Sequence, residues 1–304
     1  MPRIAVFTKN RTNPAYEAAR LGADRTAGRL GAITVHYVPD TPDSAPEQIA
    51  LIGQAIFERP DAAVFVPVDE TAVNDPILGF DAAGIPLLNI ITRTTAGRRI
   101  TFVGSDDRAL ARNIGRYLFG KLSRRSTIIV LEGTPASATS RERLLGFQDA
   151  LAEHPAVNVR VSLRGDYQRG IARDVFLRTR DQWPGVDAVL CANDVMALGV
   201  VDALDANPGH GPLVVGVNAI PEAVAAIAAG QMLATADFNA MAMSEIATEA
   251  AVRHLRGDTG RDHAPGPGGR CPQLGGVERA VRGAPLAGLG RRCQPRLSAV
   301  RRVV

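Results

Sequence analysis

The chain has 304 residues, of which 46% are hydrophobic and 22% charged, and its formal net charge is +4. This length suits two lobes better than one core. The sequence contains no run of about 18 apolar residues, so it predicts no membrane span. The positive charge is confined to residues 259–304, which hold nine Arg and two acids and leave 26 basic and 29 acidic residues in 1–258. The main body is therefore mildly acidic, which excludes a basic surface for nucleic acid.

Residues 1–258 alternate short apolar runs, typical of strands, with helical patterns. In chain order we expect a first set of strands at 4–7, 33–38, 62–66, 86–91 and 100–103, with helices at 14–29, 46–57 and 72–82. The pattern then restarts, with helices at 108–122, 141–152, 169–180, 194–204, 221–229 and 240–255 and strands at 127–131, 157–163, 188–192, 213–217 and 233–236. This alternation predicts an α/β fold with two doubly wound parallel-sheet lobes. On the first helix, Ala18, Leu21, Ala27 and Leu30 share one side.

The stretch around which the chain is organised is VLEGTPASATSRERLLGF, residues 130–147. It predicts a buried strand, a Gly/Pro turn and a helix start, where Ser137, Thr139 and Ser140 offer oxygens to the free amides. Arg141 and Arg143 then lie in or beside the first helical turn. This position is the edge of an open α/β sheet where ligands bind. An arginine there either forks onto ligand oxygens or is a solvated surface charge.

Residues 259–304 break this pattern, because they lack Ile, Met, Phe, Tyr and Trp and are rich in Gly, Pro and Arg. Two interpretations remain open: a disordered basic extension, or a shifted reading frame in a GC-rich gene, since Arg outnumbers Lys 33 to 2. Cys271 and Cys293 lie in this tail, whereas Cys191 follows an apolar strand and is expected to be buried. No metal-ligand spacing or disulfide framework is present, and we predict no cofactor or metal.

Six segments, in order, resemble the type I periplasmic binding proteins, specifically their ribose-like sugar-binding branch, over residues 3–257. They read IAVFTKNRTNPAYEAARLGA, DAAVFVPVDETAV, GIPLLNI with ITFVGSDDRALARNIGRYL, GTPASATSRERLLGFQDAL, VDAVLCANDVMALGVVDAL and GQMLATADFNAMAMSEIATEAA. The resemblance implies two lobes joined by three crossovers, with a sugar or sugar-like polyol clamped between them and delivered to an ABC permease in the inner membrane.

The same resemblance implies a lobe of residues 1–103 with 236–258, a second lobe of 104–235, and hinges near 103–104 and 235–236 that close on the ligand. It further implies a monomer in the periplasm, although the chain as given begins directly with a strand and shows no leader. It implies binding without catalysis.

In the N-terminal lobe, the family's ligand residues fall on Lys9, Asn13 and Tyr16. Asn13 either binds sugar hydroxyls or forms the turn before Pro14. Tyr16 either stacks on the ring or covers the lobe edge. Where the family often has an Asp-Arg pair, this chain has Ile91 and Thr92, and Arg93 follows. Arg93 either compensates for the lost acid or lies on the surface. Thr92 and Arg93 are the remaining expected ligand residues of this lobe.

In the C-terminal lobe, the expected ligand residues are Arg141, Tyr167, Asn193, Asn218 and Phe238, while Arg143 is expected to point away. Asn193 is also a natural helix cap, and Phe238 either offers an aromatic face or packs the hinge. Asn218 stands where the family has an Asp, and Phe238 where it has a Gln. With two acids lost and Lys9, Arg93 and Arg141 kept, a sugar acid is a hypothesis beside a neutral sugar.

Other functions have less support. The sequence contains no Gly-x-Ser-x-Gly and no phosphate-binding Gly-Lys-Ser/Thr loop, and its five His are scattered. One alternative is the effector domain of a LacI-type transcriptional regulator, which would need a helix-turn-helix module before the first strand. Another is a sugar-binding protein that docks on a membrane sensor, which sequence does not distinguish from a transport protein.

Overall fold

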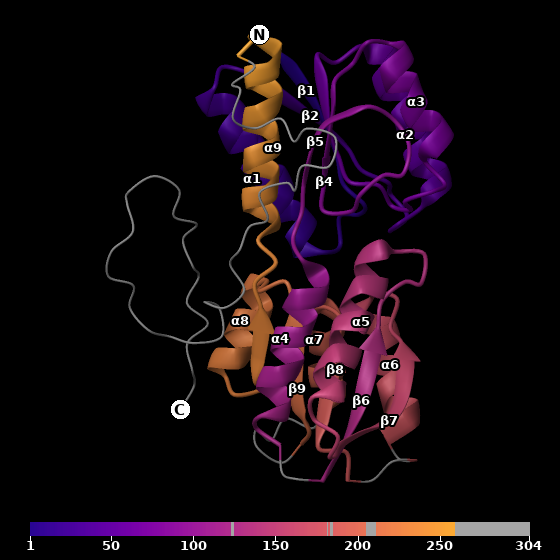
Figure 1. Cartoon of the computed structure of the whole chain (residues 1–304), viewed down its shortest axis with the longest axis vertical. Helices are drawn as coiled ribbons and strands as arrows, with labels where there is room; N and C mark the ends of the chain where they lie inside the picture. The colour runs from indigo at the N-terminus through magenta and orange to yellow at the C-terminus, as the bar shows by residue number, and fades with distance from the viewer. Residues whose placement is uncertain (123–124, 181, 183–184, 205–210, 259–304) are drawn as a thin grey trace, which may run out of the picture. The chain divides into compact units, whose positions relative to one another are not determined.

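The computed structural model describes residues 1–258 except 123–124, 181, 183–184 and 205–210 (Figure 1). Within these residues the chain divides into two compact units. Unit 1 comprises 1–105, 136–138 and 239–258, and unit 2 comprises 106–135 and 139–238. The sequence analysis placed the two divisions at 103/104 and 235/236. What was proposed for 259–304 lies outside the described residues.

Unit 1 is a parallel five-stranded sheet with the order β2-β1-β3-β4-β5. Its strands are β1 (Arg3–Phe7), β2 (Ile33–Tyr37), β3 (Ala62–Phe65), β4 (Leu87–Ile90) and β5 (Arg99–Val103), and its helices are α1 (Pro14–Arg29), α2 (Ala45–Glu58), α3 (Asn74–Ala82) and α9 (Ala240–Leu255). Because crossovers between parallel strands are right-handed, the reversal of direction after β2 puts α1 on one face and α2 and α3 on the other. Figure 1 shows α9 beside α1.

On its buried side, α1 contacts α9 mainly through small residues. Gly22 lies so close to α9 that an added Cβ would be 2.6 Å from the Met241 carbonyl oxygen. The buried positions of α1 accordingly include Ala15, Ala19 and Ala23. Leu21 is 40% exposed, so the expected apolar side through Leu21 was wrong. Large side chains are excluded because the two helix backbones approach closely.

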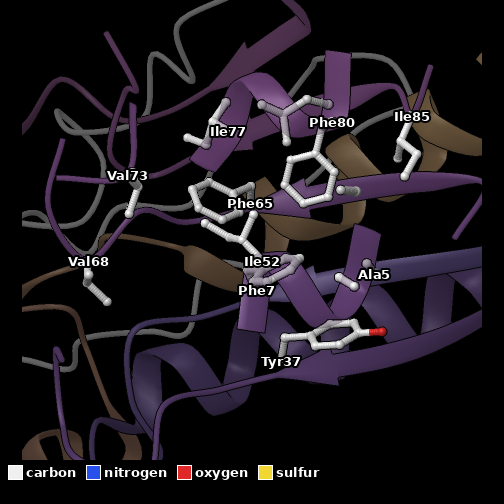
Figure 2. Close-up of a cluster of buried hydrophobic side chains, with 13 residues drawn as sticks. Ala5, Phe7, Tyr37, Ile52, Phe65, Val68, Val73, Ile77, Phe80 and Ile85 are labelled. Carbon is white, nitrogen blue, oxygen red and sulfur yellow. The ribbon is translucent and has the colours of Figure 1, made fainter. Parts of the chain in front are cut away.

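The core between the sheet and helices α2 and α3 is aromatic (Figure 2). The Phe7 ring stacks on Tyr37 with 4.8 Å between centroids, and its centroid lies 5.0 Å from that of Phe65 and 5.9 Å from that of Phe80. Figure 2 also shows Ile52 of α2 within this cluster. Side chains from four strands and two helices therefore share one buried cluster, which fixes the position of these elements.

Unit 2 is a second parallel five-stranded sheet, with the order β10-β9-β8-β6-β7. Its strands are β6 (Ser126–Glu132), β7 (Val157–Arg164), β8 (Ala188–Cys191), β9 (Leu213–Val217) and β10 (Ala234–Ala236), and its helices are α4 (Asp107–Phe119), α5 (Ala138–Ala152), α6 (Arg169–Arg180), α7 (Asp194–Ala203) and α8 (Pro221–Ala228). The same handedness rule puts α5 on one face and α6, α7 and α8 on the other. A Cβ at Gly146 of α5 would lie 2.2 Å from the Arg108 carbonyl oxygen of α4, so α4 packs tightly against α5.

The predicted α/β class and its parallel sheets are confirmed, and each expected strand and helix is present within a few residues. Cys191 is buried, as expected. The main difference is at α5, which begins at Ala138 and not at Arg141. Among the described residues, none of the helices is long and apolar enough to cross a membrane.

Candidate functional site

Ligands of open parallel sheets bind beyond the carboxyl ends of the strands. In both units, the candidate residues lie in the segments that follow strands. In unit 1 these segments follow β1 and β4, and in unit 2 they follow β6, β7, β8, β9 and β10. The two units are described separately below.

Lys9 follows β1 in unit 1 and is only 5% exposed. Burial raises the pKa of Asp43, and the positive charge of Lys9 opposes that rise. Burial also acts to raise the pKa of Asp69, but hydrogen bonds from the Ala72 and Thr71 amides outweigh it and the pKa is lowered, with a further contribution from Lys9. Lys9 therefore has two carboxylates as electrostatic neighbours within unit 1.

Asn13 is the N-cap of α1. Its Oδ1 accepts a hydrogen bond from the Ala15 amide at 3.0 Å, and its own amide donates to Asn10 Oδ1 at 2.9 Å. The side-chain oxygen therefore caps α1, a role that the sequence analysis did not propose for Asn13. Tyr16 lies in the first turn of α1 and is half-buried. Its amide donates to the Asn13 carbonyl at 2.9 Å.

The segment after β4 is held by the buried side chain of Asn89. Its Nδ2 donates to the carbonyls of Phe65 at 2.9 Å and Thr92 at 2.8 Å, and its Oδ1 accepts from the Thr94 amide at 2.8 Å. Thr92 is buried. Arg93 is exposed, and its guanidinium carbon lies 4.1 Å from the centroid of the Phe102 ring. The two neighbouring candidates therefore have opposite environments, and Arg93 interacts with its own unit.

In unit 2, the buried arginine is Arg143, and its expected surface position was wrong. Arg143 is 2% exposed, its Nε donates to Asp107 Oδ1 at 2.8 Å, and its Nη1 donates to the Ala192 carbonyl at 2.7 Å. Its guanidinium carbon lies 4.9 Å from the centroid of the Phe238 ring. Arg141 is exposed, with its Nη1 3.4 Å from the Pro135 carbonyl oxygen.

The helix register explains this exchange of the two arginines. The buried face of α5 contains Ser140, Arg143, Gly146, Phe147 and Ala150. Spacings of three, four and seven residues return to the same side of a helix. Arg141 is one residue past Ser140, about 100° around the helix axis, and so points to solvent. The sequence analysis began the helix at Arg141 and did not establish this register.

Asn193 and Asn218 each keep a buried polar atom without a partner. Asn193 caps α7, since its Oδ1 accepts from the Met196 amide at 2.9 Å, but its Nδ2 is buried and unsatisfied. Asn218 has a φ of 131°, and its Oδ1 is buried and unsatisfied. A buried group left without a hydrogen bond costs about 1–3 kcal/mol. The pair presents one donor and one acceptor, after the neighbouring strands β8 and β9.

Two aromatic candidates also lie in unit 2. Tyr167 follows β7 with a φ of 60°, and a Cβ at Gly133 would lie 2.2 Å from its Cζ, so its ring packs on the glycine that follows β6. Phe238 is buried against Arg143. Phe238 thus lies beside a buried cation, which is one combination of polar and aromatic groups that suits a sugar.

Asp194 was missed by the sequence analysis, because an acid at the start of a helix is expected to be exposed. It is fully buried: Oδ2 accepts from the Ile220 amide at 2.9 Å, and Oδ1 accepts from the Thr235 hydroxyl at 2.5 Å. Burial raises the pKa of Asp194 to about 6, although these hydrogen bonds and the charge of Arg143 act to lower it. The sequence signal was its position directly after an Asn cap and an apolar strand.

A comparison with protein-family models matches residues 4–259 to the periplasmic binding protein domain. The chain belongs to this family. It is 28% identical over 232 residues to the ribose import binding protein RbsB of Escherichia coli, covering 76% of this chain and 77% of that protein. It is 29% identical over 270 residues to the D-ribose/D-allose-binding protein of Pseudomonas aeruginosa, covering 85% and 83%.

A comparison with solved structures agrees with this family assignment. An ABC transporter periplasmic solute binding protein from Actinobacillus succinogenes, with bound D-allose, aligns with a TM-score of 0.80 and 26% identity over 84% of this chain and 92% of that one. The periplasmic binding protein of the arabinose ABC transporter from a Shewanella species aligns with a TM-score of 0.76. The predicted resemblance is confirmed. The periplasmic binding proteins are carriers. Separately, no cluster of three or more metal-ligating side chains occurs in the described residues.

Proposed function

We propose that the protein is a solute-binding protein that binds a sugar or sugar-like polyol and delivers it to an ABC importer. The observation that carries the proposal is the pair of buried atoms, Asn193 Nδ2 and Asn218 Oδ1, that have no partner. A sugar hydroxyl both donates and accepts, so one polyol satisfies both. The printed functions of the similar proteins, ribose, allose and arabinose binding, point to the same ligand class.

The proposed ligand contacts are given for each unit by itself. Arg143 takes the place first given to Arg141, because it is the arginine buried beside Phe238 and the Asn193 segment. The remaining contacts are those of the sequence analysis: Lys9, Asn13, Tyr16, Thr92, Arg93, Tyr167, Asn193, Asn218 and Phe238. The role of Phe238 is to support the guanidinium and to offer an apolar face to the sugar ring.

A neutral sugar fits these residues better than a sugar acid. The positive charge of Arg143 is already paired with Asp107. Lys9 lies near Asp43 and Asp69. An anionic ligand would compete with these acids for Arg143 and Lys9, and the third proposed cation, Arg93, is exposed over the Phe102 ring. A neutral sugar needs no unpaired charge.

The partner and location follow from the same role. We propose a periplasmic carrier that acts as a monomer and hands its sugar to a permease in the inner membrane. Binding alone, without catalysis, is expected.

A thermal-shift screen over neutral pentoses, hexoses, polyols and sugar acids tests the proposal. A ligand present at about 100 times its Kd stabilises the folded state by about 2.7 kcal/mol, so a clear rise in Tm with a neutral sugar is expected. A response to sugar acids alone would overturn the preference for neutral ligands. No response to any member of the screen would contradict sugar binding itself.

A further inference from the structure

The turn after β9 has a strained backbone at two residues other than glycine. Asn218 has a φ of 131° and Ala219 a φ of 52°. Such conformations cost about 1–3 kcal/mol each and persist only where neighbouring groups hold them. Asn218 is also the residue whose unsatisfied Oδ1 is proposed to meet the sugar. Whatever holds this turn therefore determines where that oxygen lies.

The Asp194 carboxylate holds the turn after β9 through hydrogen bonds. Oδ2 accepts from the Ile220 amide at 2.9 Å, and Oδ1 accepts from the Thr235 hydroxyl at 2.5 Å. Thr235 Oγ1 in turn accepts from the Ala219 amide at 3.2 Å. We call Asp194, Thr235, Ala219 and Ile220 the Asp194 latch. It ties α7, the turn after β9, and β10 together.

The space around the carboxylate is closed. A Cβ at Gly216 of β9 would lie 2.3 Å from Asp194 Oδ1, so the glycine is required for the acid to fit. The charge that acts on Asp194 is that of Arg143 of α5, and Asp194 in turn acts on the buried thiol of Cys191 of β8. Burial raises the pKa of the Cys191 thiol, which keeps it neutral. Arg143 pairs with Asp107, and its positive charge also acts to lower the pKa of Asp194.

We propose that Asp194, given the sugar-binding function proposed above, is a positioning residue that holds Asn218 for the sugar through the latch and makes sugar affinity fall on acidification. The ionised carboxylate accepts hydrogen bonds on both oxygens. A proton on one oxygen removes an acceptor from the Ile220 amide or the Thr235 hydroxyl, and the strained turn loses a restraint. Burial places this proton uptake near pH 6.

The coupling runs in both directions. A sugar that fixes Asn218 also fixes the Ile220 amide against the carboxylate, which favours the ionised form. Sugar binding near pH 6 therefore releases a proton from the protein. A residue that only supported the fold would not make this release depend on ligand.

The test compares Asp194→Asn with Asp202→Asn, an acid of the same helix that pairs on the surface with Arg169. The probe is whichever of D-ribose, D-allose and D-arabinose the wild type binds most tightly at pH 7.5. Losing one hydrogen bond to a buried charge corresponds to about tenfold in affinity. We expect Asp194→Asn to bind about tenfold more weakly at pH 7.5 with no further loss at pH 5, and wild type and Asp202→Asn to lose affinity between pH 7 and 5.

Thr235 provides a second pair of variants should Asp194→Asn fail to fold. Thr235→Ser keeps the hydroxyl and is expected to bind like wild type, whereas Thr235→Val removes it and is expected to weaken binding. Calorimetry at pH 6 in buffers with different heats of ionisation reports the released proton. Equal affinities and pH profiles for wild type, Asp194→Asn and Thr235→Val would overturn the positioning role while leaving sugar binding intact.

A measurement without ligand separates the latch from the function. Amide hydrogen exchange should show Ile220 protected in wild type at pH 7.5, and at least about tenfold less protected in Asp194→Asn. Equal protection in both would overturn the latch. If the wild type protects the Ile220 amide but binds none of the three sugars, the latch exists and the proposed function has failed. The coupling of the latch to sugar binding would then be overturned as well.

Discussion

The two units repeat one topology but hold their ligand-edge segments by different chemistry. Both sheets are parallel, and their orders, β2-β1-β3-β4-β5 and β7-β6-β8-β9-β10, are the same when counted from the first strand of each unit. In unit 1 the segment after β4 is held by the neutral amide of Asn89. In unit 2 the turn after β9 is held by the carboxylate of Asp194. Equal topology thus allows one of these two segments to be held by a neutral amide and the other by a titratable carboxylate.

The buried interiors of the two units also differ in their chemistry. Unit 1 has an aromatic cluster around Phe7. Unit 2 contains the buried ion pair of Arg143 and Asp107 and the second buried acid, Asp194. Buried charges are stabilising only while their partners remain, so we expect unit 2 to be the more sensitive to single polar substitutions.

The largest effect is expected for Arg143→Ala. It leaves Asp107 buried without its partner, which costs about 3–5 kcal/mol, and it removes the cation beside Phe238. The free energy of unfolding, measured in urea, should fall by this amount, and sugar binding should be lost. The matched variant Arg141→Ala, on the exposed side of α5, should change either quantity little. Loss of binding in Arg141→Ala alone would restore the original assignment of the two arginines.

The second effect is the pH dependence that Asp194 gives to stability. Its folded pKa of about 6 lies above the ordinary value of 3.8. The folded state therefore binds more protons than the unfolded chain between these values, and this contribution to stability rises as pH falls from about 6 to 4. A shift of about two units corresponds to about 3 kcal/mol.

Urea unfolding at a series of pH values measures this contribution as the difference between wild type and Asp194→Asn. Asp202 provides the opposite control, since its hydrogen bond with Arg169 lowers its pKa and its stabilising contribution is lost on acidification. Parallel stability profiles for wild type and Asp194→Asn would contradict the raised pKa. A variant of Asn89 should leave the pH profile unchanged.

The smallest effect is expected for Asn218→Gly. Glycine adopts a φ of 131° without the steric cost that asparagine has there. The substitution also removes the unsatisfied Oδ1. Unfolding measurements should show about 1 kcal/mol of stabilisation, while sugar affinity falls. Reduced stability together with unchanged affinity would show that the Asn218 oxygen does not meet the ligand.

Local patterns were sufficient to predict the order and type of the elements. Apolar runs flanked by Gly and Pro marked each strand, because buried parallel strands need continuous apolar side chains. Asn193 was recognised as a cap candidate for the same local reason, and it caps α7 in the structure. Asn13 was expected only as a ligand residue or a turn former, and it caps α1.

Features that depend on tertiary packing could not be read in this way. Which arginine of α5 is buried depends on the helix face that packs against the rest of unit 2, and the match to the family motif wrongly placed Arg143 at the surface. The burial of Asp194 depends on Gly216 and Thr235, which are distant in sequence. The exposure of Leu21 depends on the close approach of α9 to α1. In each case the interacting residues lie far apart in the sequence, so a short stretch of sequence does not contain them together.

The return of α9 to unit 1 has a consequence for biosynthesis. Unit 2 is formed mainly by the continuous span 106–238, whereas unit 1 needs α9, which packs on α1, β3, β4 and β5. As the ribosome makes the chain from its N-terminus, unit 2 can complete its sheet before unit 1 receives its last helix. The first segment to be synthesised is thus the last to complete its native packing.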